Sequence, residues 1–270
     1  VCDMRQYGSF FRIRFLAGLQ YRAAAWAGVS TQFAWGGLTL LLYAAFHRSG
    51  SANFPMTFSQ LSSYIWLQQA LLALFMSWYF DNEILESVST GGVAYELCRP
   101  CDLYAMWFVK NLAVRLSRTS LRCAPILLVA SFLPAPFRLS APAGWEAALL
   151  FPISLALGLL VIVSFSMLIY ISSFYTISTL GIRLLSSSVV EFFSGAVIPL
   201  PFFPEQLQAV INVLPFASIQ STPFLIYTGH LAGRQALQSV AVQLLWLAGL
   251  LVLGRMLMGR ALKKVVVQGG

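Results

Sequence analysis

Charged residues are scarce in this sequence, and acidic residues are the scarcest. Asp, Glu, Lys and Arg make up 10% of the 270 residues, whereas 59% are hydrophobic, and the mean hydropathy is +0.77. A water-soluble domain of this size cannot bury so much apolar surface without exposing large hydrophobic patches. The composition therefore excludes an ordinary soluble domain and predicts that residues 1–270 form a single domain embedded in a membrane.

Motifs for chemistry on a bound ligand are also missing. The sequence has no Gly-x-x-x-x-Gly-Lys-Ser/Thr phosphate loop, so the chain cannot hold ATP in that way. Cys98-x-x-Cys101 has metal-ligand spacing, but no second pair or neighbouring histidine completes a zinc site. His47 and His230 have no serine, cysteine or carboxylate set around them. We therefore expect no catalytic residue, no metal and no cofactor on this chain.

What the sequence does have is a series of long apolar stretches. Each is near the roughly 20 residues that a helix needs to cross a bilayer. This pattern predicts an all-α membrane protein with six transmembrane helices, at residues 26–46, 61–80, 121–137, 147–172, 184–200 and 237–258.

The basic residues are distributed unevenly along this plan. With the N-terminus in the cytoplasm, 14 of the 17 Lys and Arg fall in inside segments, and the three outside are Arg48, Arg138 and Arg234. Positive charge favours the cytoplasmic side of membrane proteins. We therefore expect a multi-pass protein with both termini in the cytoplasm. The basic excess then reflects orientation and contact with anionic lipid rather than nucleic-acid binding.

The N-terminal residues 1–25 lack the continuous apolar core of a cleavable signal peptide. Tyr7, Phe11, Phe15 and Leu19 recur every four residues, which places them on one side of a helix. This spacing predicts an interfacial helix at the membrane surface. The alternative is a frayed cytoplasmic tail.

The longest predicted cytoplasmic segment, residues 81–120, contains five of the nine acidic residues. Its beginning, Asp81 to Val88, has the pattern of a short amphipathic helix that Gly91 and Gly92 would end. A polar helix just below the membrane is suited to docking a partner, and the alternative is a solvated connector.

The fifth apolar run ends in Ser-Gly-Ala-Val-Ile-Pro-Leu-Pro-Phe-Phe-Pro at residues 194–204, with Leu214-Pro215-Phe216 and Pro223 further on. Prolines interrupt helices, and irregular backbone at membrane depth must be buried in protein or face a water-filled cavity. We therefore expect residues 201–229 to form an extracellular re-entrant segment beside a translocation pathway.

Two of these stretches resemble a known family when they are taken in order. Gly91-Gly92-Val93-Ala94-Tyr95-Glu96-Leu97-Cys98-Arg99-Pro100 is similar to the cytoplasmic motif of ABC-2 type transporter permeases, in which a glycine precedes Leu-x-Arg-Pro. The Ser-Gly-x-x-Ile-Pro-Leu stretch and the later prolines resemble the fifth helix and re-entrant hairpin of the same family. The resemblance covers nearly the whole chain.

This resemblance implies a permease subunit of an ATP-driven exporter in a bacterial plasma membrane. Two permeases, identical or related, would pair with two separate ABC ATPase subunits, which would bind the ATP and Mg. The implied ATPase-coupling residues are Asp81, Glu83, Ile84, Glu86, Ser87, Gly91, Gly92, Leu97, Arg99 and Pro100. The implied pathway or dimer-interface residues are Glu191, Ser194, Gly195, Pro199, Pro201, Phe202, Phe203, Pro204, Pro215 and Phe216.

Glu191 is the one acidic residue well inside a predicted crossing, where a carboxylate exposed to lipid is costly. It would bind a cationic part of the substrate, pair with a cation across a dimer seam, or be hydrogen-bonded or protonated within the bundle. Arg183 lies roughly 12 Å away along a straight helix, too far for direct pairing.

Arg115, Arg118 and Arg122 have i, i+3, i+7 spacing and share one helix face. One interpretation is a route that guides an anionic headgroup or acidic substrate toward the pathway. The other is a set of topology anchors whose side chains extend to lipid phosphates.

Two other functions compete with that of an exporter. A secondary transporter independent of an ATPase also has broken helices, although no internal repeat is visible in this sequence. An intramembrane enzyme needs a catalytic set that the sequence does not supply. The resemblance allows drug, peptide, lipid, glycoconjugate and polysaccharide substrates, and the sequence does not select among them.

Overall fold

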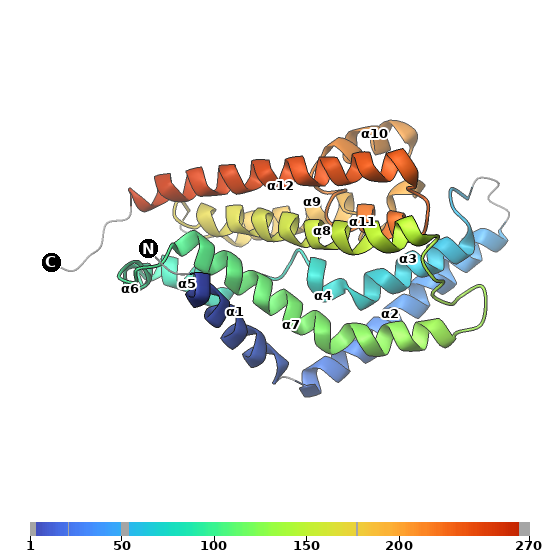
Figure 1. Ribbon diagram of the computed structural model, residues 1–270, viewed down its shortest axis with the longest axis horizontal. Helices are drawn as coiled ribbons and strands as arrows, with labels where there is room; N and C mark the ends of the chain where they lie inside the picture. Colours follow the sequence, from blue (N-terminus) through green and yellow to red (C-terminus); the bar gives the residue numbers. More distant parts are fainter. Residues whose placement is uncertain (1–3, 21, 50–53, 177, 265–270) are drawn as a thin grey trace.

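The computed structural model describes residues 4–20, 22–49, 54–176 and 178–264 (Figure 1). Within these ranges the protein is helical and has no strand, which confirms the predicted all-α class. The helices are α1 (Met4–Leu19), α2 (Arg22–Arg48), α3 (Phe58–Ala70), α4 (Leu72–Phe75), α5 (Asn82–Ser89), α6 (Val93–Leu97), α7 (Leu103–Phe132), α8 (Trp145–Ser172), α9 (Leu180–Phe193), the 3-10 helix η1 (Leu200–Phe202), α10 (Glu205–Val213), α11 (Ser221–Tyr227) and α12 (Gly233–Leu262).

Three segments of the described chain are long and apolar enough to cross a membrane. They are Ala23–Arg48 in α2, Trp145–Ser172 in α8 and Gly233–Leu262 in α12. At 1.5 Å of rise per residue they are roughly 40–45 Å long, which exceeds the hydrocarbon thickness of about 30 Å. They coincide with the crossings predicted at 26–46, 147–172 and 237–258.

The boundaries predicted for the other three crossings are wrong. The range 61–80 is divided between α3 and α4 and ends in non-helical chain. The helix expected at 121–137 is the second half of α7 and stops at Phe132, and the helix expected at 184–200 stops at Phe193. With 14 residues, α9 is only about 21 Å long and is too short to span the hydrocarbon alone.

The segment predicted as the cytoplasmic coupling segment, 81–120, also differs from expectation. It contains α5 and α6, but from Leu103 onward it is the first half of α7. Asp102 caps that helix, because its carboxylate accepts a hydrogen bond of 2.7 Å from the backbone N–H of Ala105. The polar residues of this half are largely packed against other helices, so their charge does not mark a loop.

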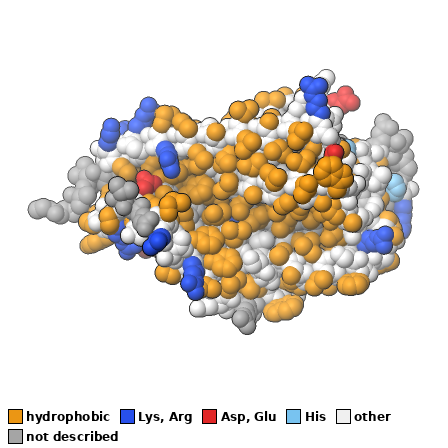
Figure 2. Space-filling view, viewed as in Figure 1, with side chains coloured by type: hydrophobic (Ala, Val, Ile, Leu, Met, Phe, Trp, Pro, Cys, Tyr) orange, Lys and Arg blue, Asp and Glu red, His pale blue; other side chains and the backbone are white. Residues whose placement is uncertain are grey.

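The long helices pack side by side along the long axis of the molecule (Figure 1). Helix α8 contacts α12 on one side and α7 on the other, and α7 also contacts α1 and α2. Figure 2 shows hydrophobic side chains over the middle of the visible face, with charged side chains toward the two ends of the long axis. This distribution fits a bundle whose middle lies in a bilayer.

The N-terminal segment expected as one helix over residues 1–25 is divided. Helix α1 ends at Leu19 and α2 begins at Arg22. None of the α1 residues is buried, although the helix lies along α7. Its assignment to the membrane interface stays a prediction, as does the re-entrant character of 201–229, which contains most of η1 together with α10 and α11.

Gly195 terminates α9 and explains why the fifth helix ends early. Its φ is +83°, a left-handed conformation that favours glycine. Tyr64 of α3 donates a hydrogen bond of 3.0 Å to the carbonyl oxygen of Gly195, and the Gln68 amide donates to that of Ala196. A side chain at Gly195 would meet the Tyr64 hydroxyl at 2.5 Å. The break is therefore paired with protein groups, as irregular backbone in a bundle must be.

Candidate functional site

Helix α5 is fastened to the bundle at its N-cap residue, Asp81. The Asp81 carboxylate caps the helix by accepting a hydrogen bond of 3.0 Å from the backbone N–H of Glu83. Its second oxygen lies 2.9 Å from the Lys110 ammonium of α7. The two side chains are only 9% and 8% exposed. This ion pair is largely shielded from water, so the removal of one partner would leave a buried charge unpaired.

Glu83 adds a second ionic link from the first turn of α5. One of its carboxylate oxygens lies 2.6 Å from the Lys110 ammonium and 3.3 Å from the Arg14 guanidinium of α1. The hydrogen bond and positive charge of Lys110 hold the pKa of the Glu83 carboxyl below its usual value. Because this side chain is 69% exposed, water and salt weaken both contacts. Through Glu83, α5 is tied to both α7 and α1.

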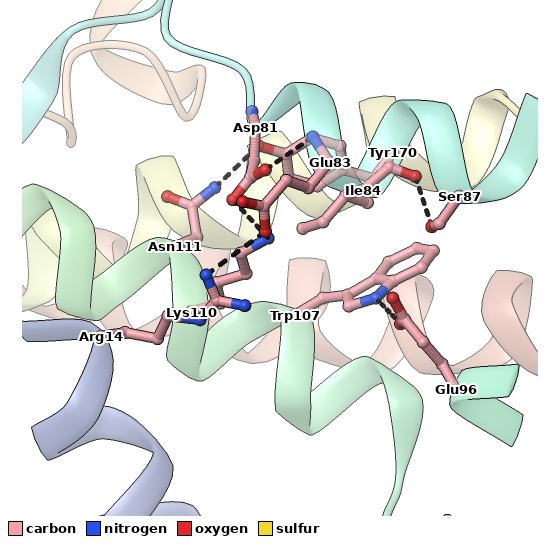
Figure 3. A network of polar contacts seen from close by, with 10 residues as sticks. All are labelled: Arg14, Asp81, Glu83, Ile84, Ser87, Glu96, Trp107, Lys110, Asn111 and Tyr170. Carbon is pink, nitrogen blue, oxygen red and sulfur yellow. Dashed lines mark hydrogen bonds and ion pairs between the residues drawn. The ribbon is translucent and has the colours of Figure 1, made fainter. Parts of the chain in front are cut away.

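Apolar packing completes the attachment of α5. Figure 3 shows the side chains involved, Ile84, Trp107 and Tyr170. Ile84 is 1% exposed and belongs to a buried cluster that includes Trp107 of α7 and Tyr170 of α8. The Trp107 indole N–H also donates a hydrogen bond of 2.7 Å to the Glu96 carboxylate of α6. Burying an isoleucine side chain contributes about 1.5–3 kcal/mol. The inner face of α5 and α6 is therefore anchored on α7 and α8.

A chain of hydrogen bonds begins at the same helix start. The backbone N–H of Asp81 donates to the Tyr170 hydroxyl at 2.8 Å, and the Asn111 amide donates to the same hydroxyl at 3.3 Å. The Asn111 carbonyl oxygen in turn accepts a hydrogen bond of 2.7 Å from Arg115. The chain links α5 to α8 and then to the middle of α7.

Arg115 carries this network to the end of α4. One guanidinium nitrogen donates to the carbonyl oxygens of Leu74 and Met76, at 3.0 and 2.9 Å. Another donates to the Ser166 hydroxyl of α8 at 3.3 Å. The Arg115 side chain is completely buried. It supplies donors to carbonyls that the interrupted α3–α4 helix leaves without intrahelical partners.

The opposite face of α5 and α6 is open. Its exposed residues include Glu86, Tyr95 and Leu97, and exposed Arg99 and Pro100 follow α6 directly; Tyr95 is 82% exposed. A surface that mixes an aromatic ring, an aliphatic side chain and both charges is suited to protein contact. We call these five residues the outward surface.

The predicted coupling residues thus separate into three groups. Asp81, Glu83 and Ile84 hold α5 to the bundle, and Ser87 donates a hydrogen bond to the Ile84 carbonyl oxygen. Gly91, with φ of +78°, and Gly92 form the turn between α5 and α6. The remaining four, Glu86, Leu97, Arg99 and Pro100, lie on the outward surface.

Apart from Glu191, the residues predicted for the pathway or dimer interface lie in the chain that follows α9. Ser194, Gly195, Pro199, Pro201 and Pro215 are buried, Phe202, Phe203 and Phe216 are half-buried, and Pro204 is exposed. Ring contacts join them to their surroundings: Phe203 to Phe192, Phe216 to Phe193 and Phe165, and Phe202 to Tyr43 and Phe54. Most of their surface is used in packing.

A polar cavity lies beside this group and was not expected from the sequence. It has a volume of about 350 Å³ and is lined by uncharged polar residues of α10, α11 and α12, among them Gln208, Asn212, Thr222, Gln235 and Gln238. These residues are spread over 31 positions, so no local motif reveals them.

Glu191 is half-buried on α9. No ion pair or hydrogen bond to its carboxylate is present among the described residues. Arg183 does not pair with it: its guanidinium lies over the Phe80 ring, 5.0 Å from the centroid. The three interpretations of Glu191 given above stay predictions.

The three arginines predicted to act together do not share one environment. Arg115 faces the interior, so its assignment to lipid contact or to a substrate route is wrong. The i, i+3, i+7 spacing did not reveal this, because neighbouring helices cover part of the face. Arg118 and Arg122 are half-buried and line a cavity between α7, α1 and α2.

Sequence reasoning also missed the residues that receive α5. Lys110, Asn111 and Trp107 lie on α7 and Tyr170 on α8, between 11 and 89 positions from their partners. The one available signal was that Lys110 and Asn111 are polar residues in a stretch that forms a helix and have no oppositely charged residue nearby in the sequence.

The described residues contain no group of three or more His, Cys, Asp or Glu side chains placed to hold a metal ion.

One comparison with known proteins shows the family of the chain. The sequence model of the family described as ABC-2 family transporter protein matches residues 33–269. No curated protein matches the chain. The match includes α5, α6 and the broken segment after α9, which carried the resemblance noted from the sequence.

Proposed function

The chain belongs to the ABC-2 transporter family, and on this premise we propose that it is the transmembrane permease subunit of an ABC exporter. The observation that carries the proposal is the family match over residues 33–269. In this proposal a separate ATPase subunit binds ATP and Mg and supplies the energy. The permease itself performs no covalent chemistry.

The attachment of α5 and α6 supports a coupling role. Their inner face is fixed to α7 and α8 by Ile84 and the Asp81–Lys110 pair, while the outward surface is free among the described residues to meet another protein. A force applied to the outward surface would move α5 and the ends of α7 and α8 together. We assign α5 and α6 as the element that receives motion from the ATPase.

The proposed mechanism is alternating access. Closure of the ATP-bound motor dimer would shift the population between an inward-open and an outward-open arrangement of the helices. The hydrogen-bonded chain from Asp81 through Tyr170, Asn111 and Arg115 gives such a shift a physical route to the end of α4.

The remaining parts of the proposal rest on the family. The permease works as a dimer with an identical or related subunit, in a bacterial plasma membrane with both termini in the cytoplasm. Residues around the break after α9 line the pathway or the dimer seam. The substrate is an amphiphile: a lipid-like molecule, a peptide or a drug.

The test is purification of the tagged permease from its native membrane. We expect an ABC ATPase subunit to be recovered with it in fixed stoichiometry, and substrate export by the reconstituted complex to stop when its ATPase is inactivated. A secondary transporter is the alternative function. Transport that persists without an ATPase and follows an ion gradient would replace the exporter with that alternative.

A further inference from the structure

A cavity on the α1–α2 side of α7 contains more positive than negative charge. It has a volume of about 570 Å³, within the range of small-molecule sites. Its charged lining residues are Arg14, Asp81, Glu83, Lys110, Arg118 and Arg122. Four cations and two carboxylates leave an excess of two positive charges at neutral pH.

The two carboxylates are already paired within the protein. Asp81 binds Lys110, and Glu83 binds Lys110 and Arg14. The excess therefore belongs to Arg118 and Arg122. Arg118 lies over the Tyr79 ring, 4.2 Å from its centroid, and among the described residues no carboxylate pairs with either arginine.

These two guanidinium groups are placed close together without a counterion. They are four residues apart on α7, so they share one face, where like charges repel. Both are half-buried, and partial removal from water makes an uncompensated charge more costly. A bound anion would relieve both effects, and guanidinium groups match the geometry of phosphate oxygens.

Most of the remaining lining residues are apolar, and two of them lie at the start of a candidate membrane span. Ala24 and Ala25 come from α2, directly after the span begins at Ala23, and Leu121 comes from α7. Trp26 follows them and is 65% exposed, as suits a tryptophan at headgroup level. Anionic charge at this depth is supplied by the phosphate of a lipid.

Gly28 provides the space for Arg122. A Cβ atom at Gly28 would lie 2.6 Å from the central guanidinium carbon of Arg122. Any side chain at this position would displace the guanidinium while leaving its charge in place. This contact allows the geometry of the cavity to be tested separately from its charge.

We propose that Arg118 and Arg122 bind the phosphate of an anionic amphiphile, with its apolar part against the start of α2. A membrane lipid or lipid-linked molecule would bind in this way from the inner leaflet. The proposal concerns binding and does not depend on ATP-driven transport.

The test uses the full-length permease in nanodiscs of phosphatidylcholine, without ATPase or ATP, and phosphatidylglycerol as the probe. Retention of phosphatidylglycerol is measured by native mass spectrometry across a titration. We expect preferential binding by the unmodified protein and at least a tenfold weaker affinity for Arg118→Gln/Arg122→Gln. The matched control is Arg5→Gln/Arg12→Gln, which removes the same charge from exposed positions of α1 and should change the affinity less than twofold.

Gly28→Ala keeps every charge and should weaken the affinity several-fold. This variant tests the proposal independently if the double variant does not fold. Equal affinity in all variants, or equal losses in the double variant and its control, would overturn the proposal. Added inorganic phosphate distinguishes the source of the ligand. If phosphatidylglycerol stays bound in millimolar phosphate, the ligand is a lipid headgroup. If phosphate displaces the lipid at a concentration near that of the lipid, the same anion site takes a soluble phosphate ligand.

Discussion

Arg115 donates a hydrogen bond of 2.9 Å to the backbone carbonyl oxygen of Met76, from the middle of one helix to the end of another. The same guanidinium nitrogen also donates a hydrogen bond to the carbonyl oxygen of Leu74. A completely buried arginine thus supports the point where the second apolar segment stops being helical. In the described structure Arg115 is a structural residue.

We expect Arg115→Met to destabilise the protein strongly. The change leaves the carbonyl groups of Leu74 and Met76 without this donor, and each buried unsatisfied group costs about 1–3 kcal/mol. The measurement is the thermal unfolding midpoint of the purified permease, with size-exclusion chromatography used to monitor the loss of folded protein. Arg138→Met, at an exposed position, should leave the midpoint nearly unchanged. Similar midpoints for the two variants would contradict the role of Arg115.

The two acidic residues of α5 should behave differently in assembly. Glu86→Lys reverses a charge on the outward surface, so we expect it to weaken recovery of the ATPase while the permease keeps its thermal stability. Glu83→Lys replaces a residue that already pairs with Lys110 and Arg14. Its main effect should therefore be a lower stability of the permease, rather than a direct loss of ATPase contact. Pull-down yield and unfolding midpoint, measured on both variants, separate these effects. Unchanged recovery of the ATPase with Glu86→Lys would remove Glu86 from the docking surface.

Glu83 also predicts a dependence of stability on pH. Its pKa is lowered in the folded protein from the reference value of 4.5 by Lys110. Its contribution is therefore fully present above the unfolded pKa and is lost as pH falls through the lower folded pKa. Because Glu83 is largely exposed, the contribution should be no more than about 1 kcal/mol.

The difference in unfolding midpoint between the unmodified protein and Glu83→Gln measures this contribution directly. It should be constant near neutral pH, narrow below pH 4.5, and shrink at high salt. A difference that grows as the pH is lowered would have the wrong sign.

Gly158 of α8 should not tolerate a side chain. A Cβ atom there would overlap the backbone carbonyl oxygen of Ile219, just before α11. Gly158→Ala should therefore separate α11 from α8 and lower the unfolding midpoint, even though alanine is the better helix former. Gly249→Ala in α12 is the control, because a Cβ atom at Gly249 has no neighbour within 4 Å. Equal midpoints in the two variants would show that this close approach does not limit packing.

Glu191 allows a test of substrate charge. If its carboxylate binds a cationic part of the substrate, Glu191→Gln should reduce export of a cationic dye by the ATPase–permease complex and leave export of a neutral dye unchanged. The expected loss is severalfold, because the amide keeps the shape and removes the charge. Equal transport of the cationic dye by both proteins would exclude the substrate role.

The parts of the fold that were predicted correctly depend on patterns that are local in sequence. The apolar runs of α2, α8 and α12 are longer than the thickness of a bilayer requires, so hydropathy alone located them. The amphipathic helix pattern of residues 81–88, followed by Gly91 and Gly92, marked α5. In each case the residues that determine the element lie within it or beside it.

The candidate site was predicted only in part, because its other half comes from distant positions. Glu83 was interpreted as a docking residue, yet Lys110, 27 positions away, holds it against the bundle. Arg115 was grouped with Arg118 and Arg122 by helical spacing. Helical spacing predicts which residues share a face, but it does not predict which neighbouring helix covers that face. Of the three arginines, Arg115 is the one that forms hydrogen bonds at the end of α4.

The sequence by itself determined that this chain is a helical membrane protein, since hydropathy and turn-forming residues act over short distances. Its resemblance to the ABC-2 family rested on two short motifs, which are also local in sequence. Only the tertiary structure decided which polar groups face inward. Most charged or hydrogen-bonding side chains in a protein interior have a partner within about 3 Å. Those partners, such as Lys110 for Asp81 and the Met76 carbonyl for Arg115, are brought together by the packing of helices that are far apart in the chain.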